Sequence, residues 1–227
     1  MRKRLVITGS EGLIGKGLVS HFSALYEVIS LDLSLGNDLS DEAFVEKWFR
    51  ENSGLYGMIV CHARNPIPVK SSKKIEPTDI SLADVRRYFE VNTISAFSVC
   101  QHFIKNNKKG VIVNLSSVYG ALSPRHEIYK DFVKPIGYSM SKASIVIMSK
   151  YLATYYAPDI RVNTVVLGGV ADSKQDLNFV KEYSLHTPAG RLMNLEEVTS
   201  VFDFLLSEKS SYITGSELYV DGGWTAW

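Results

Sequence analysis

The sequence offers little to a membrane, to nucleic acid or to a disulfide framework. No apolar run reaches the roughly 18 residues that a membrane span requires, and the basic residues at positions 2–4 lead into only a short apolar run, unlike a signal peptide. The net charge of +1 argues against a dedicated nucleic-acid surface. The two cysteines, Cys61 and Cys100, have no metal-binding or disulfide spacing. We therefore expect a cytoplasmic protein with no metal site and no membrane or nucleic-acid partner.

The chain instead alternates short β-branched runs with amphipathic stretches. The runs are typical of buried parallel strands, and the stretches are typical of helices that cover such a sheet. A length of 227 residues suits one domain with a substantial core. We predict one α/β domain over residues 1–227, a doubly wound parallel sheet with helices on both faces. Predicted strands cover 3–8, 27–31, 57–61, 110–117, 160–166 and part of 214–223, and predicted helices run from the first glycine turn to about 25 and over 41–52, 82–105, 138–156 and 195–206.

A glycine-rich turn, Gly9-Ser-Glu-Gly12-Leu-Ile-Gly15, directly follows the first predicted strand. In a dinucleotide-binding turn the first glycine makes the tight bend, the second lets the backbone approach the pyrophosphate, and the third lets helix and strand pack closely. The following helix N-terminus offers free N–H groups to the phosphates. The alternative is a turn whose glycines serve packing alone. On the first interpretation the residues that bind the cofactor are Gly9, Glu11, Gly12, Leu13 and Ile14.

An acidic residue, Asp32, ends the second predicted strand, 23 residues after Gly9. That is close to the spacing of roughly 20 residues at which a carboxylate binds a ribose 2′-hydroxyl. A carboxylate there would repel the extra phosphate of NADP, so NAD is favoured. Asp38 and Leu39 follow after a short loop and could meet the adenine edge. The alternative for Asp38 is a helix cap for the segment that starts at Asp41.

Several loops follow other predicted strands at the same edge of the sheet, where parallel sheets bind ligands. The loop that begins at His62 could place His62 and Arg64 against cofactor or substrate, or leave them as ordinary loop surface. Gly168 follows the strand 160–166 and would let the backbone approach the nicotinamide end. At the end of the strand 110–117, either Ser116 or Ser117 brings a hydroxyl to this edge.

Tyr138 and Lys142 lie four residues apart, so a helix presents both on one face. A fixed cation nearby favours the phenolate and lowers the tyrosine pKa from its ordinary value of about 10. Such a tyrosine can donate and accept protons at neutral pH. The alternative is a Tyr–Lys pair on a solvated helix face. Asn92, a polar residue inside an apolar helical pattern, reads on its own as a satisfied core group.

Taken together, these motifs resemble the short-chain dehydrogenase/reductase family, over essentially the whole chain. The resemblance implies a Rossmann fold in which Tyr138 is the general acid and base. It implies that Lys142 binds the nicotinamide ribose and lowers the tyrosine pKa, that Ser117 hydrogen-bonds the reacting oxygen, and that Asn92 helps hold a relay water. Homotetramers or homodimers are common in the family. Matching segments are 8–15, Val91-Asn92, Val113-Asn-Leu-Ser-Ser117, Tyr138-x-x-x-Lys142, Arg161-Val-Asn163 and Val220-Asp-Gly-Gly223, and further cofactor contacts would come from Cys61, His62, Ala63, Gly168 and Val170.

Three departures from the family pattern stand out. The glycine spacing is that of the longer sugar-nucleotide branch, although the chain length and the Val-Asp-Gly-Gly ending fit the short single-domain branch. Cys61-His-Ala-Arg64 replaces the usual Asn-Asn-Ala-Gly, and Leu167-Gly168 replaces the usual Pro-Gly. The long polar stretch 121–136, which we expect to border the substrate, and the tryptophan-rich ending resemble oxidoreductases of bacterial surface-sugar and flagellin-glycan biosynthesis.

We therefore predict reversible hydride transfer between NAD(H) and a secondary alcohol or ketone of a small polar molecule, with a sugar or sugar phosphate as the suggested class. The alternatives are a nucleotide-sugar epimerase or dehydratase that retains NAD, suggested by the glycine spacing, and a non-catalytic NAD-binding regulator. We expect the segment 171–188, which lacks strong periodicity, to be a mobile flap. Trp224 and Trp227 could serve a subunit interface, or cap the pocket or core.

Overall fold

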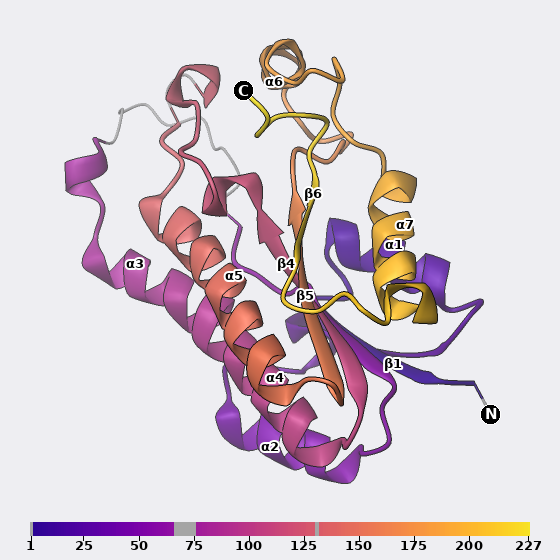
Figure 1. The fold of residues 1–227 in the computed structure, drawn as a ribbon. Coiled ribbons are helices and arrows are strands. Elements are labelled where there is room, and N and C mark those ends of the chain that lie inside the picture. Colours follow the sequence, from indigo (N-terminus) through magenta and orange to yellow (C-terminus); the bar gives the residue numbers. More distant parts are fainter. Residues whose placement is uncertain (1, 66–75, 130–131) are drawn as a thin grey trace.

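The computed structural model describes residues 2–65, 76–129 and 132–227. In these residues a six-stranded, all-parallel sheet forms the centre of the molecule (Figure 1), with the order β2-β1-β3-β4-β5-β6. The predicted α/β class and parallel sheet are confirmed, and the predicted strand ends hold to within a few residues. The strands are β1 (Arg4–Thr8), β2 (Glu27–Leu31), β3 (Gly57–Val60), β4 (Gly110–Ser117), β5 (Ile160–Leu167) and β6 (Glu217–Val220).

The strand order reverses once, between β1 and β3. The chain first moves outward from β1 to β2, then returns to the other side of β1 and continues outward to β6. At such a switch point the loops that leave the two central strands diverge and open a crevice at the carboxyl ends of the strands. The fold therefore brings the residues that follow β1 and β3 together at the carboxyl edge of the sheet, where Gly9 packs against the His62 backbone.

Helices cover both faces of the sheet. The helix α1 packs with α7 on one face, and α2, α4 and α5 cover the other (Figure 1). Within the described ranges, no helix combines the length and the apolarity needed to cross a membrane. The helices are α1 (Leu13–Phe22), α2 (Glu42–Glu51), α3 (Leu82–Phe89), α4 (Ser95–Asn106), α5 (Ile136–Tyr156), α6 (Leu177–Leu185) and α7 (Leu195–Leu206). Short 3₁₀ turns lie at Leu33–Leu35, Pro77–Asp79, Val118–Gly120, His126–Tyr129 and Glu208–Ser210.

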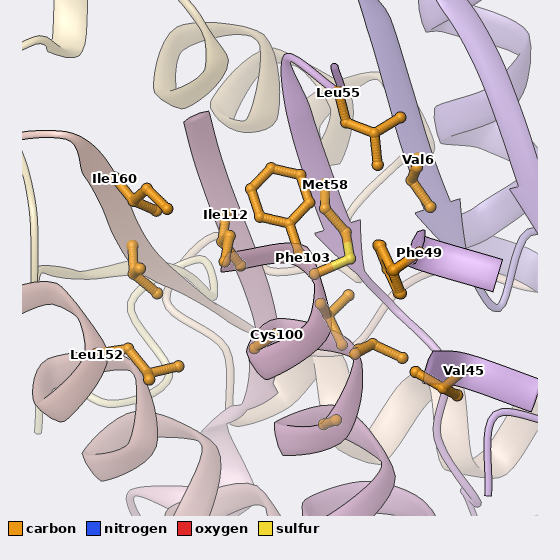
Figure 2. Packing of buried hydrophobic residues seen from close by; sticks show 14 of the residues in the cluster. Val6, Val45, Phe49, Leu55, Met58, Cys100, Phe103, Ile112, Leu152 and Ile160 are labelled. Carbon is orange, nitrogen blue, oxygen red and sulfur yellow. The ribbon is translucent and has the colours of Figure 1, made fainter. Parts of the chain in front are cut away.

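Alternation along the strands divides the core into two layers. Val6 of β1 points toward α2, α4 and α5, whereas Leu5 and Ile7 point toward α1 and α7. Successive strand residues face opposite sides, so a strand buried on both faces must be apolar throughout. Figure 2 shows the first layer, in which Phe49 of α2 and Phe103 of α4 fill the space beneath the sheet. This packing explains why the buried runs were readable as strands.

The long helix predicted over 82–105 is interrupted. α3 ends at Phe89, and the five residues Glu90–Ile94 form a π-helical turn before α4 begins. A π turn adds one residue to the helical repeat and is found most often at functional sites. The apolar period continues across the turn, so the sequence pattern did not reveal it. The turn carries Asn92.

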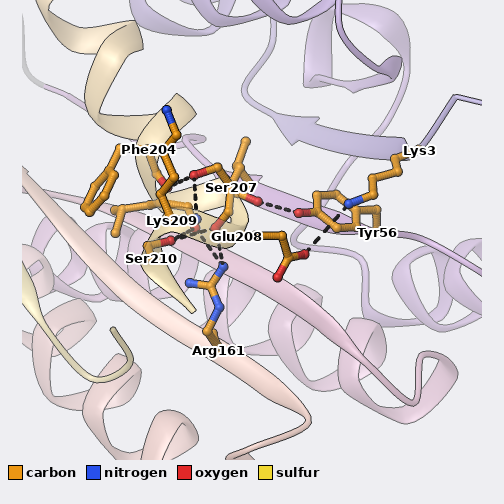
Figure 3. A network of polar contacts seen from close by, with 10 residues as sticks. Lys3, Tyr56, Arg161, Phe204, Ser207, Glu208, Lys209 and Ser210 are labelled. Atoms are coloured by element: carbon orange, nitrogen blue, oxygen red, sulfur yellow. Dashed lines mark hydrogen bonds and ion pairs between the residues drawn. The ribbon is translucent and has the colours of Figure 1, made fainter. Parts of the chain in front are cut away.

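A polar network closes the opposite end of the sheet (Figure 3). The Arg161 guanidinium donates to the carbonyl oxygens of Leu205 and Ser207 at the end of α7, at 3.0 and 3.3 Å. The Tyr56 hydroxyl donates to the carbonyl of Leu206, and the Lys3 ammonium lies 3.8 Å from the centre of the Tyr56 ring. The last carbonyls of a helix lack partners within the helix. Arg161, one of the family-like residues, therefore has a structural role.

The segment 171–188 contains the helix α6, which the sequence pattern did not predict. Asp176 caps this helix by accepting from the N–H groups of Asn178 and Phe179. Tyr183 of α6 stacks on Trp224, with ring centres 4.1 Å apart. Trp224 is only 3% exposed, so it belongs to the core, and the interface interpretation is wrong for this residue; Trp227 is 71% exposed. The mobility of the segment stays a prediction.

Candidate active site

The glycine turn after β1 shows which glycines packing requires. Gly9 has φ +66°, and a Cβ there would lie 2.6 Å from the His62 backbone. A Cβ on Gly15 would lie 2.1 Å from the Gly9 carbonyl oxygen, so both glycines are needed to close the turn. A Cβ on Gly12 would make only an ordinary contact of 3.4 Å with that oxygen. Packing therefore accounts for Gly9 and Gly15, and leaves Gly12 as the glycine that a ligand would require.

The start of α1 has the character of an anion site. Gly12 is its N-cap, no side chain caps the helix, and no acidic residue lies in its first turn. The N–H groups of the first helical turn therefore have no side-chain acceptor and remain open to an anion. The Ser10 hydroxyl beneath the turn is buried and has no hydrogen-bond partner among the described residues. These features fit the pyrophosphate of a dinucleotide, held by the turn and the first helical residues, Leu13 and Ile14.

Asp32 lies beside this turn, as predicted. Its carboxylate accepts from the Glu11 N–H at 3.1 Å, from the Ser34 N–H at 2.9 Å and from the Ser34 hydroxyl at 2.8 Å. Burial alone would raise the pKa of Asp32, but the hydrogen bonds from Ser34 and Glu11 outweigh it and keep the pKa below its ordinary value. Asp32 is thus an oriented carboxylate at the edge of the crevice. Glu11 itself is exposed and pairs with Lys16 at 3.4 Å.

The next two predicted cofactor residues lie before α2. Asp38 accepts from the N–H and hydroxyl of Ser40, at 2.9 and 2.6 Å, whereas Asp41 is the residue that caps α2. The alternative of Asp38 as that helix cap is therefore wrong. Leu39 has its side chain in the core, 7% exposed, and its carbonyl accepts from the Ser95 hydroxyl at 2.7 Å. Contact of Asp38 and Leu39 with an adenine ring stays a prediction, and for Leu39 it would involve the backbone.

His62 after β3 links two elements inside the protein. One ring nitrogen lies 2.7 Å from the Thr8 hydroxyl of β1, and the other lies 3.0 Å from the Ser95 hydroxyl of α4. Burial, with a smaller effect of the Lys142 charge, lowers the pKa of His62 to about 4, so the ring is neutral. Both nitrogens are engaged, which explains why His62 can replace the usual asparagine as a support for the crevice. Thr8 and Ser95 were missed because isolated hydroxyls leave no sequence pattern.

The neighbours of His62 follow the same backbone. The N–H of Cys61 donates to the Thr8 hydroxyl at 3.1 Å, and burial raises the pKa of its thiol to about 12, so the thiol is not ionised. Ala63 is half-buried and Arg64 exposed. The Arg64 guanidinium lies 5.5 Å from the centre of the Tyr88 ring. The rest of the proline-containing loop, 66–75, lies outside the described residues.

Asn92 is 1% exposed and hydrogen-bonded through its whole amide. Its oxygen accepts from the Arg64 N–H at 2.7 Å, and its NH₂ donates to the Arg64 carbonyl at 3.1 Å and to the Ser141 hydroxyl at 2.9 Å. It therefore joins the loop after β3 to α5. This is the satisfied polar group of the simpler interpretation, placed within the site. Its role in holding a water stays a prediction.

The two serines at the end of β4 have different surroundings. Ser116 is buried, and its hydroxyl donates to the Lys142 carbonyl at 2.8 Å. Ser117 is half-buried; its hydroxyl accepts from the Tyr119 N–H at 3.2 Å and interacts with the Tyr138 phenol. Ser117, and not Ser116, is therefore the hydroxyl that accompanies Tyr138.

Tyr138 and Lys142 share one face of α5, and that face points into the protein. Tyr138 is 7% exposed and Lys142 4%, so the alternative of a solvated pair is wrong. The Lys142 ammonium donates to the Leu115 carbonyl at 2.9 Å, and burial lowers the pKa of Lys142 to about 8. A buried cation with one neutral partner is held at a substantial cost in stability.

Lys142 does not have the expected effect on Tyr138 in this structure. Burial raises the pKa of Tyr138 above its ordinary value of 10.0, and the opposing contribution comes from Ser117. The lysine side chain is directed to the Leu115 carbonyl, and desolvation dominates the environment of the phenol. The motif was correctly located, but with the Lys142 ammonium directed to the Leu115 carbonyl the pKa of Tyr138 is raised and not lowered.

A second buried lysine was not among the predicted site residues. Lys134, in the stretch 121–136, is 9% exposed, and its ammonium lies 4.5 Å from the centre of the Tyr138 ring and 5.8 Å from that of Tyr119. The contact with Tyr138 places Lys134 beside the candidate catalytic residue, and the expected contact of the stretch with the substrate stays a prediction. Which of its several polar side chains turns inward could not be read from a segment without periodicity. Lys130 and Asp131 of the same stretch lie outside the described residues.

The turn after β5 is packed tightly by the protein itself. A Cβ on Gly168 would lie 2.9 Å from the Asp221 Cα, and the Gly169 N–H donates to the Tyr183 hydroxyl at 2.8 Å. Val170 pairs with Met193 in an isolated parallel bridge. These contacts explain the glycines structurally. Binding of the nicotinamide end by Gly168 and Val170 stays a prediction.

Known proteins resemble the chain along most of its length. A family model described as enoyl-(acyl carrier protein) reductase matches residues 15–225. The post-translational flagellin modification protein A of Campylobacter coli is 29% identical over 205 residues, 87% of this chain and 78% of that protein. Glucose 1-dehydrogenase of Gluconobacter oxydans is 32% identical over 201 residues, 83% of this chain and 70% of that protein. The solved structure of a Leptospira borgpetersenii short-chain dehydrogenase with bound NAD+ has a TM-score of 0.88 at 28% identity, covering 99% of this chain and 93% of that one.

With this fold, this edge of the sheet and these relatives, the chain belongs to the short-chain dehydrogenase/reductase family. It is an NAD(P)-dependent oxidoreductase that acts on CH–OH groups. The predicted likeness to proteins associated with flagellin is confirmed to the extent that the Campylobacter relative is named a flagellin modification protein.

Replacing Lys142 by methionine should stabilise the protein at neutral pH. The pKa of Lys142 is about 10.5 in the unfolded chain and about 8 in the folded protein. Between pH 8 and 10.5 the folded state therefore binds fewer protons than the unfolded state, and the stability of the wild type rises with pH. Lys142→Met removes the buried charge but also loses the hydrogen bond to the Leu115 carbonyl. With that loss subtracted, we expect the variant to raise the free energy of unfolding by on the order of 1–2 kcal/mol at pH 7. The gain should shrink between pH 8 and 10.5 in denaturant titrations. A variant less stable than wild type at pH 7 would contradict this, and Lys181→Met, at an exposed position of α6, is the control.

Proposed function

We propose that the protein is a cytoplasmic, NAD-dependent dehydrogenase or reductase that interconverts a secondary alcohol and a ketone on a sugar or a sugar derivative. The observation that carries this proposal is the buried group at the end of β4, where Tyr138 interacts with Ser117 and Lys142 lies one helical turn away. Asn92 and His62 brace the same edge. A non-catalytic regulator would have no use for the Tyr138 phenol and the Ser117 hydroxyl brought together beside this lysine.

Each residue has a definite part in the proposed chemistry. When bound, the cofactor supplies the hydride acceptor or donor. Ser117 orients the reacting oxygen and stabilises charge as it develops there. Tyr138 takes the hydroxyl proton during oxidation and returns it during reduction. Lys142 would turn from the Leu115 carbonyl to the nicotinamide ribose and supply positive charge close to the phenol, which offsets the effect of burial on its pKa.

The suggestion of a sugar rests on the relatives and on the residues that surround Tyr138. One relative is named a glucose dehydrogenase and another a flagellin modification protein. Lys134, of the stretch 121–136, brings its ammonium to 4.5 Å from the centre of the Tyr138 ring. A polar, hydrogen-bonding substrate suits these surroundings better than an apolar one, because an apolar molecule would leave buried donors without partners.

Replacing Tyr138 by phenylalanine should abolish most turnover without loss of NADH binding. The ring still packs, but the proton donor is gone, and general acid–base assistance is typically worth about 10²–10⁴-fold. The assay is NAD+ reduction with a panel of sugars, sugar phosphates and nucleotide sugars. Tyr88→Phe, in a ring that packs edge-on to Tyr138, is the matched control and should stay active.

Unchanged turnover in Tyr138→Phe would refute the assignment. If the wild type binds NADH but turns over nothing in the panel, the regulator is favoured. If it converts a nucleotide sugar while retaining NAD without net consumption, the epimerase or dehydratase is favoured.

The preference for NAD rests on Asp32. Its carboxylate is fixed beside the glycine turn by three hydrogen bonds and keeps its negative charge at neutral pH. That position suits acceptance of a hydrogen bond from a ribose hydroxyl. The same carboxylate would repel a 2′-phosphate, and each of its oxygens accepts at least one hydrogen bond that keeps it in place.

Asp32→Ala should reduce the preference for NAD+ over NADP+ by about 10- to 100-fold, measured as the ratio of kcat/KM values or, without a substrate, of dissociation constants. Asp38→Ala is the matched control, because Asp38 also binds a nearby serine through its N–H and hydroxyl. We expect it to leave the ratio unchanged if Asp38 does not approach the 2′-position. A wild-type protein that prefers NADP+ would contradict the proposed role of Asp32.

We also propose that the protein self-associates through α5. Five apolar side chains of this helix are about half exposed or more: Ile136, Met140, Ile147, Tyr151 and Tyr155. The last three are spaced by four residues and therefore form one stripe. Such a contiguous apolar stripe is typical of a surface that a second copy covers. A homodimer or homotetramer would result.

Ile147→Glu should shift the protein toward the monomer, because a carboxylate in the centre of an apolar interface loses its hydration. The mass is measured by light scattering after size-exclusion chromatography. Leu177→Glu, at an exposed leucine of α6, is the control and should leave the mass unchanged. A monomeric wild type would refute the proposal.

A further inference from the structure

The ammonium of Lys134 is a buried cation close to the reacting tyrosine. Its side chain is 9% exposed, and the amino group lies 4.5 Å from the centre of the Tyr138 ring. Lysine is among the residues least often buried, and burial of an ammonium is costly unless a partner compensates it. Its position therefore calls for a physical reason.

Within the described residues, no carboxylate pairs with the Lys134 ammonium, although a buried cation is costly without such a partner. Its one hydrogen bond within the described residues goes to the side-chain oxygen of Asn65, at 3.1 Å, and no ion pair involving it is found there. The tyrosine rings of residues 119 and 138 face it, and burial raises the pKa of both phenols, so neither provides an anion. An ammonium has three donors. Two of them have no described acceptor.

Two neutral aromatic rings and one amide oxygen do not fully offset the free-energy cost of burying this ammonium. Burial lowers the pKa of Lys134 to about 8, which shows that the surroundings favour the uncharged form. An arriving anion would reverse that preference. Charged hydrogen bonds of this kind are the strong ones in proteins.

Lys134 also has the right position relative to the chemistry. It lies in the segment 132–135 that leads directly into α5, two residues before the helix begins, and it packs over the ring whose hydroxyl interacts with Ser117. A small molecule whose oxygen reaches Tyr138 and Ser117 would have its neighbouring groups close to Lys134. Asn65, on the loop after β3, reaches the same point from the other side.

We propose that Lys134 is a specificity-determining residue that binds an anionic group, a carboxylate or a phosphate, of the substrate. The substrate class is thereby narrowed from sugars in general to acidic sugars or sugar phosphates. This inference rests on the proposed function in one respect, that the substrate binds beside Tyr138. The competing explanation is that Lys134 only packs over the aromatic rings through a cation–π contact.

Binding to the holoenzyme tests the proposal without requiring the physiological substrate. Calorimetric titrations of the protein saturated with NADH use three probes of similar size: D-glucose, D-glucuronate and D-glucose 6-phosphate. In the wild type at pH 7 we expect one or both anions to bind about 10- to 100-fold more tightly than D-glucose, as one charged hydrogen-bonded contact provides. The carboxylate and phosphate probes distinguish the two sources of negative charge.

Three variants assign the effect to this side chain. Lys134→Met keeps the length and apolar stem, should fold because it removes a buried charge, and should reduce the preference for anions to about one. Lys134→Arg should retain it. Lys181→Met, at an exposed lysine of α6, should also retain it. The melting temperature of each variant shows whether the fold is intact.

The pH dependence of the preference for anions is a second measurement, and a lysine that only packed against the rings would not produce it. Anion binding requires the protonated amine, so the preference should weaken as the pH rises through about 8 in the wild type and should persist in Lys134→Arg. Lys142 titrates in the same range, but it is present in both proteins, so their difference isolates Lys134.

Three results would each overturn the proposal. The wild type would bind neutral and anionic probes equally, or neither anion would bind, or the preference for anions would survive in Lys134→Met. The cation–π contact would then be the sole role of Lys134. Tyr138→Phe separates this result from the proposed function, because it should lose turnover yet keep the anion preference. A preference for anions without any turnover would leave Lys134 as a binding residue and refute only the catalytic assignment.

Discussion

Asn92 joins three segments that are far apart in the chain, and the geometry of the site depends on it. Its amide holds the backbone of Arg64 after β3 through two hydrogen bonds and reaches Ser141 on α5 with a third. Asn92 lies in the π turn at Glu90–Ile94, which adds one residue to the helical repeat, and its side chain is buried there. With the loop and α5 fixed to one another, the residues that follow the strands meet at one edge. A parallel sheet brings polar groups there, and buried polar groups must satisfy one another.

Buried positive charge is the second feature of this edge. Lys142 and Lys134 both have pKa values lowered by burial, and each has a neutral oxygen as its described hydrogen-bond acceptor, from Leu115 and Asn65 respectively. Such charges cost stability in the free protein and become favourable when anionic or polar ligands arrive. Burial also raises the pKa of Tyr138, so this phenol stays protonated although the Lys134 ammonium lies 4.5 Å from the centre of its ring. The free protein therefore holds buried positive charge for which its described residues provide no anionic partner, and which a bound ligand would stabilise.

Most of the fold could be read from the sequence, because strands buried on both faces leave continuous apolar runs and helices leave a 3.6-residue period. Gly9, Asp32 and Ser117 were located by their positions at the ends of strands, and Tyr138 and Lys142 by their four-residue spacing on one helix. Contacts between distant segments could not be predicted in this way: the bridging role of His62, the π turn at Asn92 and the inward Lys134 each depend on tertiary packing. The lowering of the Tyr138 pKa was inferred from spacing alone, and burial, which spacing does not reveal, has the opposite effect. The helix α6 escaped notice because its period is weak.

The ionisation of Tyr138 decides most directly whether this edge of the sheet is a proton-transfer site. Ultraviolet difference titration of the wild type against Tyr138→Phe isolates this phenol from the other eleven of the 12 tyrosines. Without cofactor, we predict that Tyr138 ionises above its ordinary pKa of 10.0. With saturating NAD+, the ionisation should move to lower pH, as positive charge from Lys142 and the oxidised ring reaches the phenol. A titration that NAD+ does not shift, or a phenol that already ionises below pH 10 in the free protein, would contradict this assignment.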